Sequence, residues 1–293
     1  MKAHLSLLAA TLLFGFNYWI AKGLMPTFFS PMQIVFMRII ISFFLYLLLH
    51  FTYKRTKIEQ KDLFRLFICG VLGVSFNQIM FFEGLNYSTP GNVSLLHVLN
   101  PVLVVVFAVF IIKEKINFVK GTGILLGAAG AAFLVVYDSF ISFSNDTLKG
   151  NIFIIINLTS YSLYLVLIKP LLNKYNPVTV MMWIFFFGLL TSFPITVNYM
   201  HDIDFSLIPT SALVSLAYVI FATTFLAYLL ISYSLKRLEA SVVSYYTYLQ
   251  PVIVSTIGIM LHKEGLNMTK IISAALIFTG VYLVSKKSRI IKN

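Results

Sequence analysis

The chain has 293 residues, of which 59% are hydrophobic and 11% are charged, and its mean hydropathy is +0.90. Soluble domains carry about 25% charged residues, so this supply cannot build a water-facing surface and lipid must surround most of the chain. The net charge of +12 does not indicate a nucleic-acid partner, because the basic residues lie in short clusters between apolar runs. The single cysteine, Cys69, permits no internal disulfide and fits no metal-site spacing.

Ten apolar runs follow one another along the chain, each close to the roughly 20 residues that a helix needs to cross hydrocarbon. They lie near 4–24, 31–51, 63–84, 91–112, 119–137, 150–169, 177–198, 210–232, 239–261 and 268–285. The first run resembles a signal peptide, but nine further runs favour a retained helix. None alternates with period two, so strands are not expected. We predict an all-α integral membrane protein with ten transmembrane helices.

Lysine and arginine are distributed unevenly between the segments that join these runs. With the N-terminus in the cytoplasm, the inside segments hold 17 basic residues and the outside segments hold 4; with Arg38, inside a run, these account for all 22. Cytoplasmic loops of membrane proteins carry an excess of basic residues. Both termini are therefore predicted to be cytoplasmic.

One stretch of sequence occurs twice. HVLNPVLVVVFAVFIIKE, residues 97–114, and TYLQPVIVSTIGIMLHKE, residues 247–264, both place an amide and a proline before an apolar run that ends at Lys-Glu. Each half then contains five runs, and because five is odd the second half enters the membrane inverted. We predict two inverted five-helix repeats, 1–138 and 148–287, and a cytoplasmic tail, 288–293. Inverted repeats are typical of transporters, which bind substrate between the halves.

Several motifs resemble those of the drug/metabolite transporter superfamily, specifically its EamA-type permeases with two five-helix repeats. They are Arg38 in PMQIVFMRIIISF, the stretch FFEGLNYSTPGNVSLLHVLNP, Lys113-Glu114, and the glycines from Gly121 to Gly130. The second copy, LAYLLISYSLKRLEASVVSYYTYLQPVIV, repeats the pattern, except that the seventh run has Trp183 and its neighbours where the second run has an arginine.

The resemblance implies a carrier of the bacterial inner membrane that exports amino acids or related small metabolites. A multidrug or sugar-type permease of the same superfamily stays open, because the superfamily transports these solutes too. A receptor or an intramembrane enzyme is the alternative from a different class. The sequence lacks Gly-x-Ser-x-Gly, His-Glu-x-x-His and paired intramembrane aspartates, which favours a protein that is not an enzyme. The expected partners are a small-molecule substrate and membrane lipid; a monomer is the simplest assembly, and an oligomer stays open.

Polar and aromatic side chains inside the runs are the candidates for a substrate pathway, because polar groups in membrane helices usually face the bundle interior. These candidates are Phe14, Asn17, Arg38, Asn77, Phe81, Glu83, His97, Asn100, Tyr161, Tyr164, Tyr228, Tyr248 and Gln250. Pro101 and Pro251 are candidate hinges, since a proline inside a helix frees the carbonyl four residues earlier. No cofactor and no metal ion is expected.

Three of these candidates are ionisable, and each has more than one interpretation. Arg38 is either a structural arginine that ties helices together or a clamp for a carboxylate. Glu83 pairs with Arg38, carries a proton, or is exposed at the membrane interface. His97 titrates near neutral pH or is a hydrogen-bonded structural residue.

Overall fold

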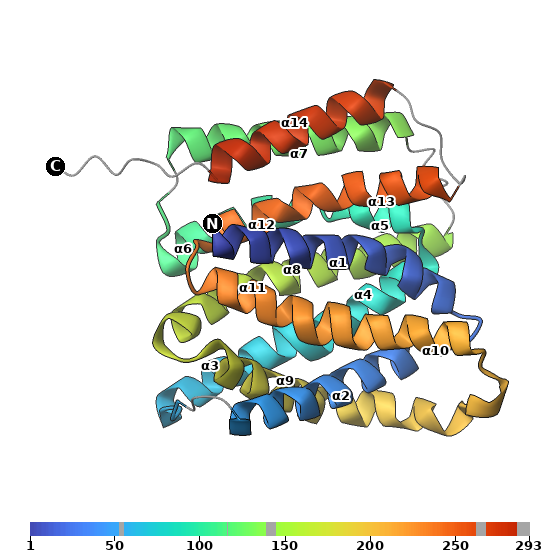
Figure 1. The fold of residues 1–293 in the computed structure, drawn as a ribbon. Coiled ribbons are helices and arrows are strands. Elements are labelled where there is room, and N and C mark those ends of the chain that lie inside the picture. Colours follow the sequence, from blue (N-terminus) through green and yellow to red (C-terminus); the bar gives the residue numbers. More distant parts are fainter. Residues whose placement is uncertain (53–55, 116, 139–144, 262–267, 286–293) are drawn as a thin grey trace.

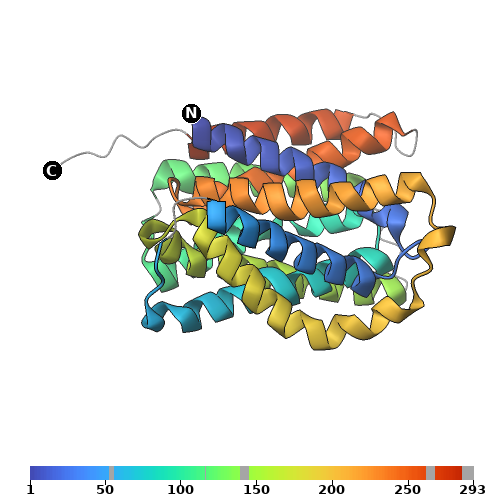
Figure 2. The same ribbon diagram turned by 60° about the horizontal axis from the view of Figure 1, so that its bottom comes forward.

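The computed structural model describes residues 1–52, 56–115, 117–138, 145–261 and 268–285, and over these residues every regular element is a helix. The helices lie side by side and run along one common axis (Figures 1 and 2). The start of α1 and the end of α14 lie at the same end of the bundle (Figure 1). The all-helical architecture expected from the apolar runs is therefore confirmed.

Eight helical segments are long and apolar enough to cross a membrane, counted over the described residues. Their bounds are Lys2–Leu24 (α1), Pro31–Thr52 (α2), Gln60–Tyr87 (α3, η1 and α4), Pro90–Ile112 (α5 and α6), Leu148–Lys174 (within α8, Asn145–Lys174), Pro177–Asp202 (α9 and η2), Thr210–Leu235 (α10, η4 and α11) and Ala240–Met260 (α12, η5 and α13). Two further helices, α7 (Phe118–Asp138) and α14 (Met268–Ser285), pack against each other at one edge of the bundle (Figure 1).

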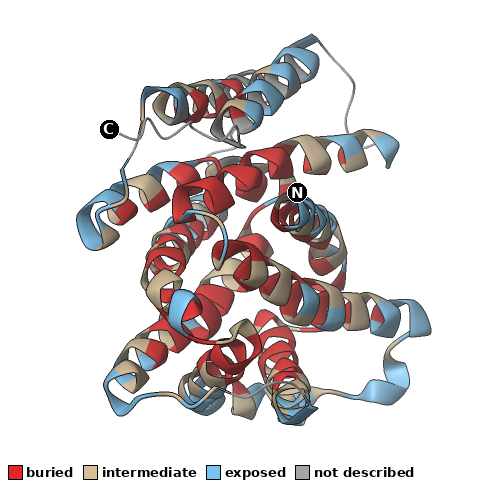
Figure 3. Cartoon of the chain, turned by 60° about the vertical axis from the view of Figure 1, so that its left-hand side comes forward, coloured by how far each residue is buried: buried red, intermediate tan, exposed pale blue. Residues whose placement is uncertain are grey.

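Exposed residues lie on the outer faces of the helices and buried residues lie between them (Figure 3). Large apolar groups cover the outside; Phe110, for example, is 80% exposed. The interior holds polar residues such as Asn100, Ser162 and Thr224, all fully buried. A surrounding hydrocarbon phase explains this pattern, because apolar groups have no reason to leave lipid and polar groups do.

Two of the long segments contain π-helical turns. In the segment that begins at Gln60, α3 (Gln60–Gly70) continues into η1 (Val71–Ser75) and then α4 (Phe76–Tyr87). In the segment that begins at Thr210, α10 (Thr210–Ala217) continues into η4 (Tyr218–Leu226) and then α11 (Ala227–Leu235). A π-helical turn holds one more residue than an α-turn, so it rotates the faces of the helix beyond it.

Two other segments are interrupted just before a proline. The helix α5 (Pro90–Leu96) ends two residues before α6 (Leu99–Ile112), which contains Pro101. Likewise α12 (Ala240–Tyr245) passes through a 3-10 turn, η5 (Tyr246–Tyr248), into α13 (Leu249–Met260), which contains Pro251. The interruptions fall where each proline leaves a backbone carbonyl without its usual partner. The His97 carbonyl finds a replacement partner nearby, because the Asn100 N–H donates to it at 3.0 Å.

Two lysines bond to carbonyl groups near the ends of neighbouring helices. Lys22, in the last turn of α1, donates from Nζ to the carbonyls of Leu85 (3.0 Å) and Asn86 (2.7 Å) at the end of α4. Lys169, near the end of α8, donates to the carbonyls of Leu235 (2.5 Å) and Leu238 (2.9 Å) at and just beyond the end of α11. Each ammonium satisfies carbonyls that have no intrahelical partner and faces the negative end of a helix dipole.

The loop before α3 is tied to α8 by charge. Lys174 approaches Glu59 at 2.6 Å and Asp62 at 2.7 Å. The hydrogen bond from Lys174, followed by that from Lys61, lowers the pKa of the Glu59 carboxyl. Such exposed pairs contribute little to the free energy of folding. Their main effect is therefore to fix the position of this loop.

Glycine allows α3 and α9 (Pro177–Thr196) to cross closely. A Cβ at Gly70 would lie 2.7 Å from the carbonyl oxygen of Ile184 and 3.1 Å from the backbone nitrogen of Gly188. Those atoms belong to the backbone and cannot move aside as a flexible side chain would. Small residues at helix crossings are the usual means of close packing in membranes.

We expect Gly70→Ala to lower the stability of the protein by about 1–3 kcal/mol, because the added methyl group overpacks the crossing. Gly23→Ala is the matched control, since a Cβ there meets nothing within 4 Å; it should be neutral or gain up to about 1 kcal/mol in helix propensity. Thermal unfolding of both variants in the same detergent compares them. Equal melting temperatures for the two variants would show that the crossing tolerates a side chain.

Candidate functional site

A cavity lies inside the bundle, between helices from both halves of the sequence. The space that the centre of a water-sized sphere can occupy in it is about 90 Å³. This cavity can therefore hold several waters or one small solute. Residues of α1, α2, α4, α6, α8, α11, α12 and α13 line it, together with the interruptions at His97 and Thr247. Among the described residues the lining includes one arginine and no aspartate or glutamate.

Most of the residues predicted to line a pathway meet in this cavity. Ten of the thirteen do so: Phe14, Asn17, Arg38, Asn77, Phe81, His97, Asn100, Tyr161, Tyr228 and Gln250. They come from seven of the long helical segments, and most share the helix faces that the spacing of polar residues indicated.

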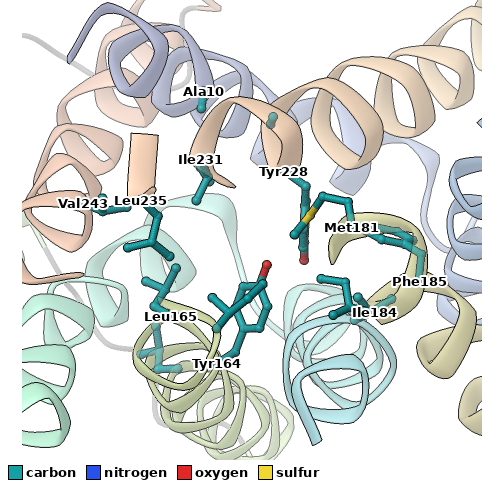
Figure 4. Close-up of a cluster of buried hydrophobic side chains, with 14 of the residues drawn as sticks. Ala10, Tyr164, Leu165, Met181, Ile184, Phe185, Tyr228, Ile231, Leu235 and Val243 are labelled. Atoms are coloured by element: carbon teal, nitrogen blue, oxygen red, sulfur yellow. The ribbon is translucent and has the colours of Figure 1, made fainter. Parts of the chain in front are cut away.

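Three predicted residues lie elsewhere. Glu83 is half-buried near the end of α4, outside the lining, and is not among the ion-pair partners of Arg38 in the described structure. The ring of Tyr164 packs against Gly73, although its side chain extends into the same interior region as that of Tyr228 (Figure 4). Tyr248 packs against Gly127 and donates to the Ile124 carbonyl at 3.5 Å. Both tyrosines fill gaps left by glycines, which sequence spacing does not reveal.

Arg38 is buried in the middle of the protein, with 3% of its surface exposed. Its Nε donates to Thr224 Oγ1 at 2.6 Å, and its guanidinium carbon lies 4.5 Å from the centroid of the Phe82 ring. The Thr224 hydroxyl in turn donates to the Val219 carbonyl at 2.8 Å, five residues back in η4. The arginine therefore joins α2 to the π-helical turn of the other half, as a structural arginine would, while also lining the cavity.

The two amides that precede Pro101 and Pro251 are oriented by hydroxyl groups from the opposite half. Tyr18 Oη donates to Gln250 Oε1 at 2.8 Å. Ser162 Oγ donates to Asn100 Oδ1 at 2.8 Å, and Asn100 Nδ2 donates to Thr247 Oγ1 at 3.1 Å. Because the amide oxygens are already occupied, the nitrogen side of Gln250 is left to the cavity.

Gln78 lines the cavity and has no partner for either end of its amide. It is 2% exposed, and its Oε1 and Nε2 both lack a hydrogen bond among the described residues. A buried amide without a partner costs about 1–3 kcal/mol. Such a group in a cavity is a candidate for contact with a bound solute or ordered water.

Three rings pack edge to face at one end of the cavity. The centroids of Tyr18 and Phe81 are 5.7 Å apart, those of Tyr18 and His97 5.6 Å, and those of Phe81 and His97 5.9 Å. His97 Nδ1 lies 2.8 Å from the Val93 carbonyl. A carbonyl only accepts, so Nδ1 carries a proton, and of the two interpretations of His97 the hydrogen-bonded structural one describes this geometry. We call Tyr18, Phe81 and His97 the aromatic cap.

A reciprocal pair of asparagines joins α4 and α8 beside the cavity. Asn77 Nδ2 donates to the Asn157 carbonyl at 3.3 Å, and Asn157 Nδ2 donates to the Asn77 carbonyl at 2.8 Å. Both residues are buried. The pair holds together two helices that belong to different halves of the sequence.

Sequence reasoning missed several lining residues, of which Tyr18 and Gln78 matter most. Each directly follows a residue that was identified, Asn17 or Asn77, and neighbours in an α-helix point about 100° apart. The wide cavity admits both neighbours. The sequence signal that could have identified them is a pair of adjacent polar residues within an apolar run, as in Asn17-Tyr18 and Asn77-Gln78.

Comparisons with known proteins find relatives along nearly the whole chain. The sequence model of the EamA-like transporter family matches residues 1–136 and 148–286. An uncharacterized transporter of Archaeoglobus fulgidus is 28% identical over 89% of this chain and 90% of its own length. A probable terminal-alkyne amino-acid exporter of Streptantibioticus cattleyicolor is 22% identical over 78% and 75% of the two chains. One solved crystal structure superposes with a TM-score of 0.74 at 17% identity, covering 97% of this chain and 96% of the other; this likeness concerns the fold alone.

We expect Asn157→Leu to destabilise the protein by about 1–3 kcal/mol, because the substitution removes a buried hydrogen bond to the Asn77 carbonyl. Thr159→Val, on the same helix, is the control: its hydroxyl bonds only to the Ile155 carbonyl within α8. Thermal unfolding in detergent should show a lower melting temperature for Asn157→Leu alone. An unchanged melting temperature would mean that the reciprocal pair contributes nothing to stability.

Proposed function

Because this chain belongs to the EamA-like transporter family, we propose that it is a secondary carrier that exports amino acids or related small metabolites by alternating access. The single observation that carries the proposal is the central cavity, to which both halves contribute polar and aromatic side chains. The relative from Streptantibioticus cattleyicolor, a probable terminal-alkyne amino-acid exporter, supports the direction and the substrate class.

Matched features in the two halves support a pair of inverted repeats, 1–138 and 148–287, as the moving parts. The lysines that bond to helix ends, Lys22 and Lys169, occupy corresponding places in the first helix of each half. The π-helical turns η1 and η4 occur in the third helix of each half, and the interruptions before Pro101 and Pro251 in the fourth. We take the two prolines as hinges, where a carrier of this design bends.

The two ends of the cavity differ in a way that suits a gated pathway. We assign the aromatic cap to the outer gate, because it packs closely over the end of the cavity that faces away from the termini. At the opposite end the lining includes Leu7 and Val243, near the starts of α1 and α12. Beyond them, Glu114 accepts a hydrogen bond from Ser241, and His4 Nδ1 lies 2.8 Å from Tyr246 Oη. These contacts join the halves at the end that the positive-inside bias assigns to the cytoplasm.

Counterflow into proteoliposomes tests the carrier proposal directly. Vesicles loaded with an unlabelled amino acid, sugar or amphipathic amine should accumulate the labelled form of at least one amino acid, saturably and only when protein is present. Uptake no greater than in protein-free vesicles for every solute would reject the proposal.

We expect Asn100→Leu to reduce counterflow about tenfold, equivalent to about 1.4 kcal/mol, because it removes an amide that bonds to the hydroxyls of Thr247 and Ser162. Val102→Leu, at an outward position of the same helix, should transport like the wild type. Equal transport by both variants would remove Asn100 from the pathway.

Inverted insertion predicts opposite locations for the two Lys-Glu motifs. Reporter tags placed after Lys115 and after Lys263, which lies outside the described residues, should appear in the cytoplasm and outside, respectively. Alkaline phosphatase and a cytoplasmic fluorescent reporter would measure this in cells. Tags on the same side of the membrane would contradict inversion.

A further inference from the structure

The formal charge of the cavity lining is of one sign. Arg38 brings the one formal charge among the described lining residues, and it is positive. Hydrogen bonds account for its Nε alone; within the described structure its two Nη nitrogens have no partner. A guanidinium buried among apolar helices is stable only with acceptors near it, and a bound anion would supply them.

Gln78 shares a helix face with the ring on which this guanidinium packs. It is one turn before Phe82 on α4, and residues four apart lie on the same helix face; the guanidinium of Arg38 packs on the Phe82 ring. Arg38, Gln78 and Tyr228 all line the cavity. The amide of Gln78, whose nitrogen and oxygen both lack a hydrogen bond among the described residues, thus offers a second donor to a solute that reaches Arg38.

Gln250 offers a further donor. Its Oε1 already accepts a hydrogen bond from Tyr18, whereas its Nε2 has no partner among the described residues, and Gln250 belongs to the lining. Asn100 adds no free donor of this kind, because its Nδ2 already donates to Thr247. The nitrogen side of Gln250 is therefore available to whatever occupies the cavity.

No group in the described lining offers a negative charge to an ammonium. His97 directs its protonated Nδ1 at the Val93 carbonyl, so its ring supplies at most one neutral acceptor. Near the start of α1 the lining combines the apolar side chains of Leu7, Leu165 and Ile231 with the hydroxyl groups of Thr11 and Ser244. Charge and polarity thus describe a solute with an anionic head and an apolar body.

We propose that the cavity recognises the carboxylate of a small, largely apolar monoanion, bound by the free Nη groups of Arg38 and the amide of Gln78. The inference rests on the proposed function in taking this cavity as the substrate site. One guanidinium balances one carboxylate, whereas a phosphate dianion would leave a charge buried without compensation. The cavity can accept an amino group on the substrate, but no carboxylate of the described lining forms an ion pair with it.

Ligand-induced thermal stabilisation of the purified protein tests this assignment, because binding to the folded state raises the melting temperature. The probes are 4-methylpentanoate, its neutral isostere 4-methylpentanamide, leucine, isoamylamine and inorganic phosphate, with phenylacetate and phenylacetamide as a second matched pair. We expect at least one acid of the two pairs to stabilise the protein, with its amide, the amine and phosphate at least tenfold weaker. Equal stabilisation by acid and amide, stabilisation by isoamylamine or phosphate instead, or no stabilisation by either acid would overturn the inference.

Variants locate the effect within the cavity. Arg38→Gln and Gln78→Glu should each weaken binding of the acid at least tenfold, the first by removing the charge and the second by adding a like charge. Gln78→Met, which keeps the length of the side chain, should weaken it less. Arg237→Gln is the matched control, since that guanidinium lies at the surface and donates to the Tyr233 carbonyl; it should bind like the wild type. Unchanged acid binding in Gln78→Glu would overturn the inference even if Arg38→Gln does not fold.

The binding assay involves no transport, so the two proposals fail separately. Counterflow of a labelled solute without any binding of carboxylates would reject the carboxylate site and keep the carrier. Selective binding of an acid without counterflow of any solute, that acid included, would reject the carrier and keep the site.

Discussion

A polar group in the hydrocarbon core of a membrane has no water to bond with, so it must find its partner inside the protein. In this chain many of those partners come from the other half of the sequence. Ser160 donates to the Leu72 carbonyl at 2.6 Å, and Tyr218 donates to the Leu13 carbonyl at 2.9 Å. Each bond involves a residue of a π-helical turn: Leu72 lies in η1 and Tyr218 lies in η4. The requirement for satisfied backbone groups thus holds the two halves together while leaving a cavity between them.

The same requirement explains why polar groups line part of the cavity. A helix interrupted before a proline offers free backbone groups, and these are tolerated only where protein or a water-filled space can meet them. Asn100 and Gln250 stand next to these interruptions, and their amides are aligned by Ser162 and Tyr18. The helix interruptions before Pro101 and Pro251 and the polar wall of the cavity are consequently two results of the same local backbone chemistry.

Much of the fold could be read from the sequence, because the length of an apolar run and the need for internal hydrogen bonds leave few alternatives to helices. The positions of the interruptions also followed from Pro101 and Pro251. The cavity was predictable in outline, since spacing along each helix identifies a polar face. Gln78 and Tyr18 were missed because helical spacing alone allows one narrow face, whereas the rotation of α4 after η1 and the width of the cavity admit two neighbours.

Three candidates, Glu83, Tyr164 and Tyr248, lie outside the cavity lining for a different reason. Tyr164 and Tyr248 pack over Gly73 and Gly127, and which glycine a ring will cover depends on how helices from different parts of the chain approach one another. Glu83 lies near a helix end, where a shift of one turn decides between interior and surface. Pairing across helices is a tertiary property, and no periodicity within one helix encodes it.

The π-helical turns have a consequence for the history of the gene. A π-helical turn is what a helix becomes when it gains a single residue without losing its ends. η1 and η4 occur in the third helical segment of each half. If the halves descend from one duplicated segment, the extra residue was already present in the ancestral single-repeat protein, which then carried this distorted helix before it was joined to a copy of itself.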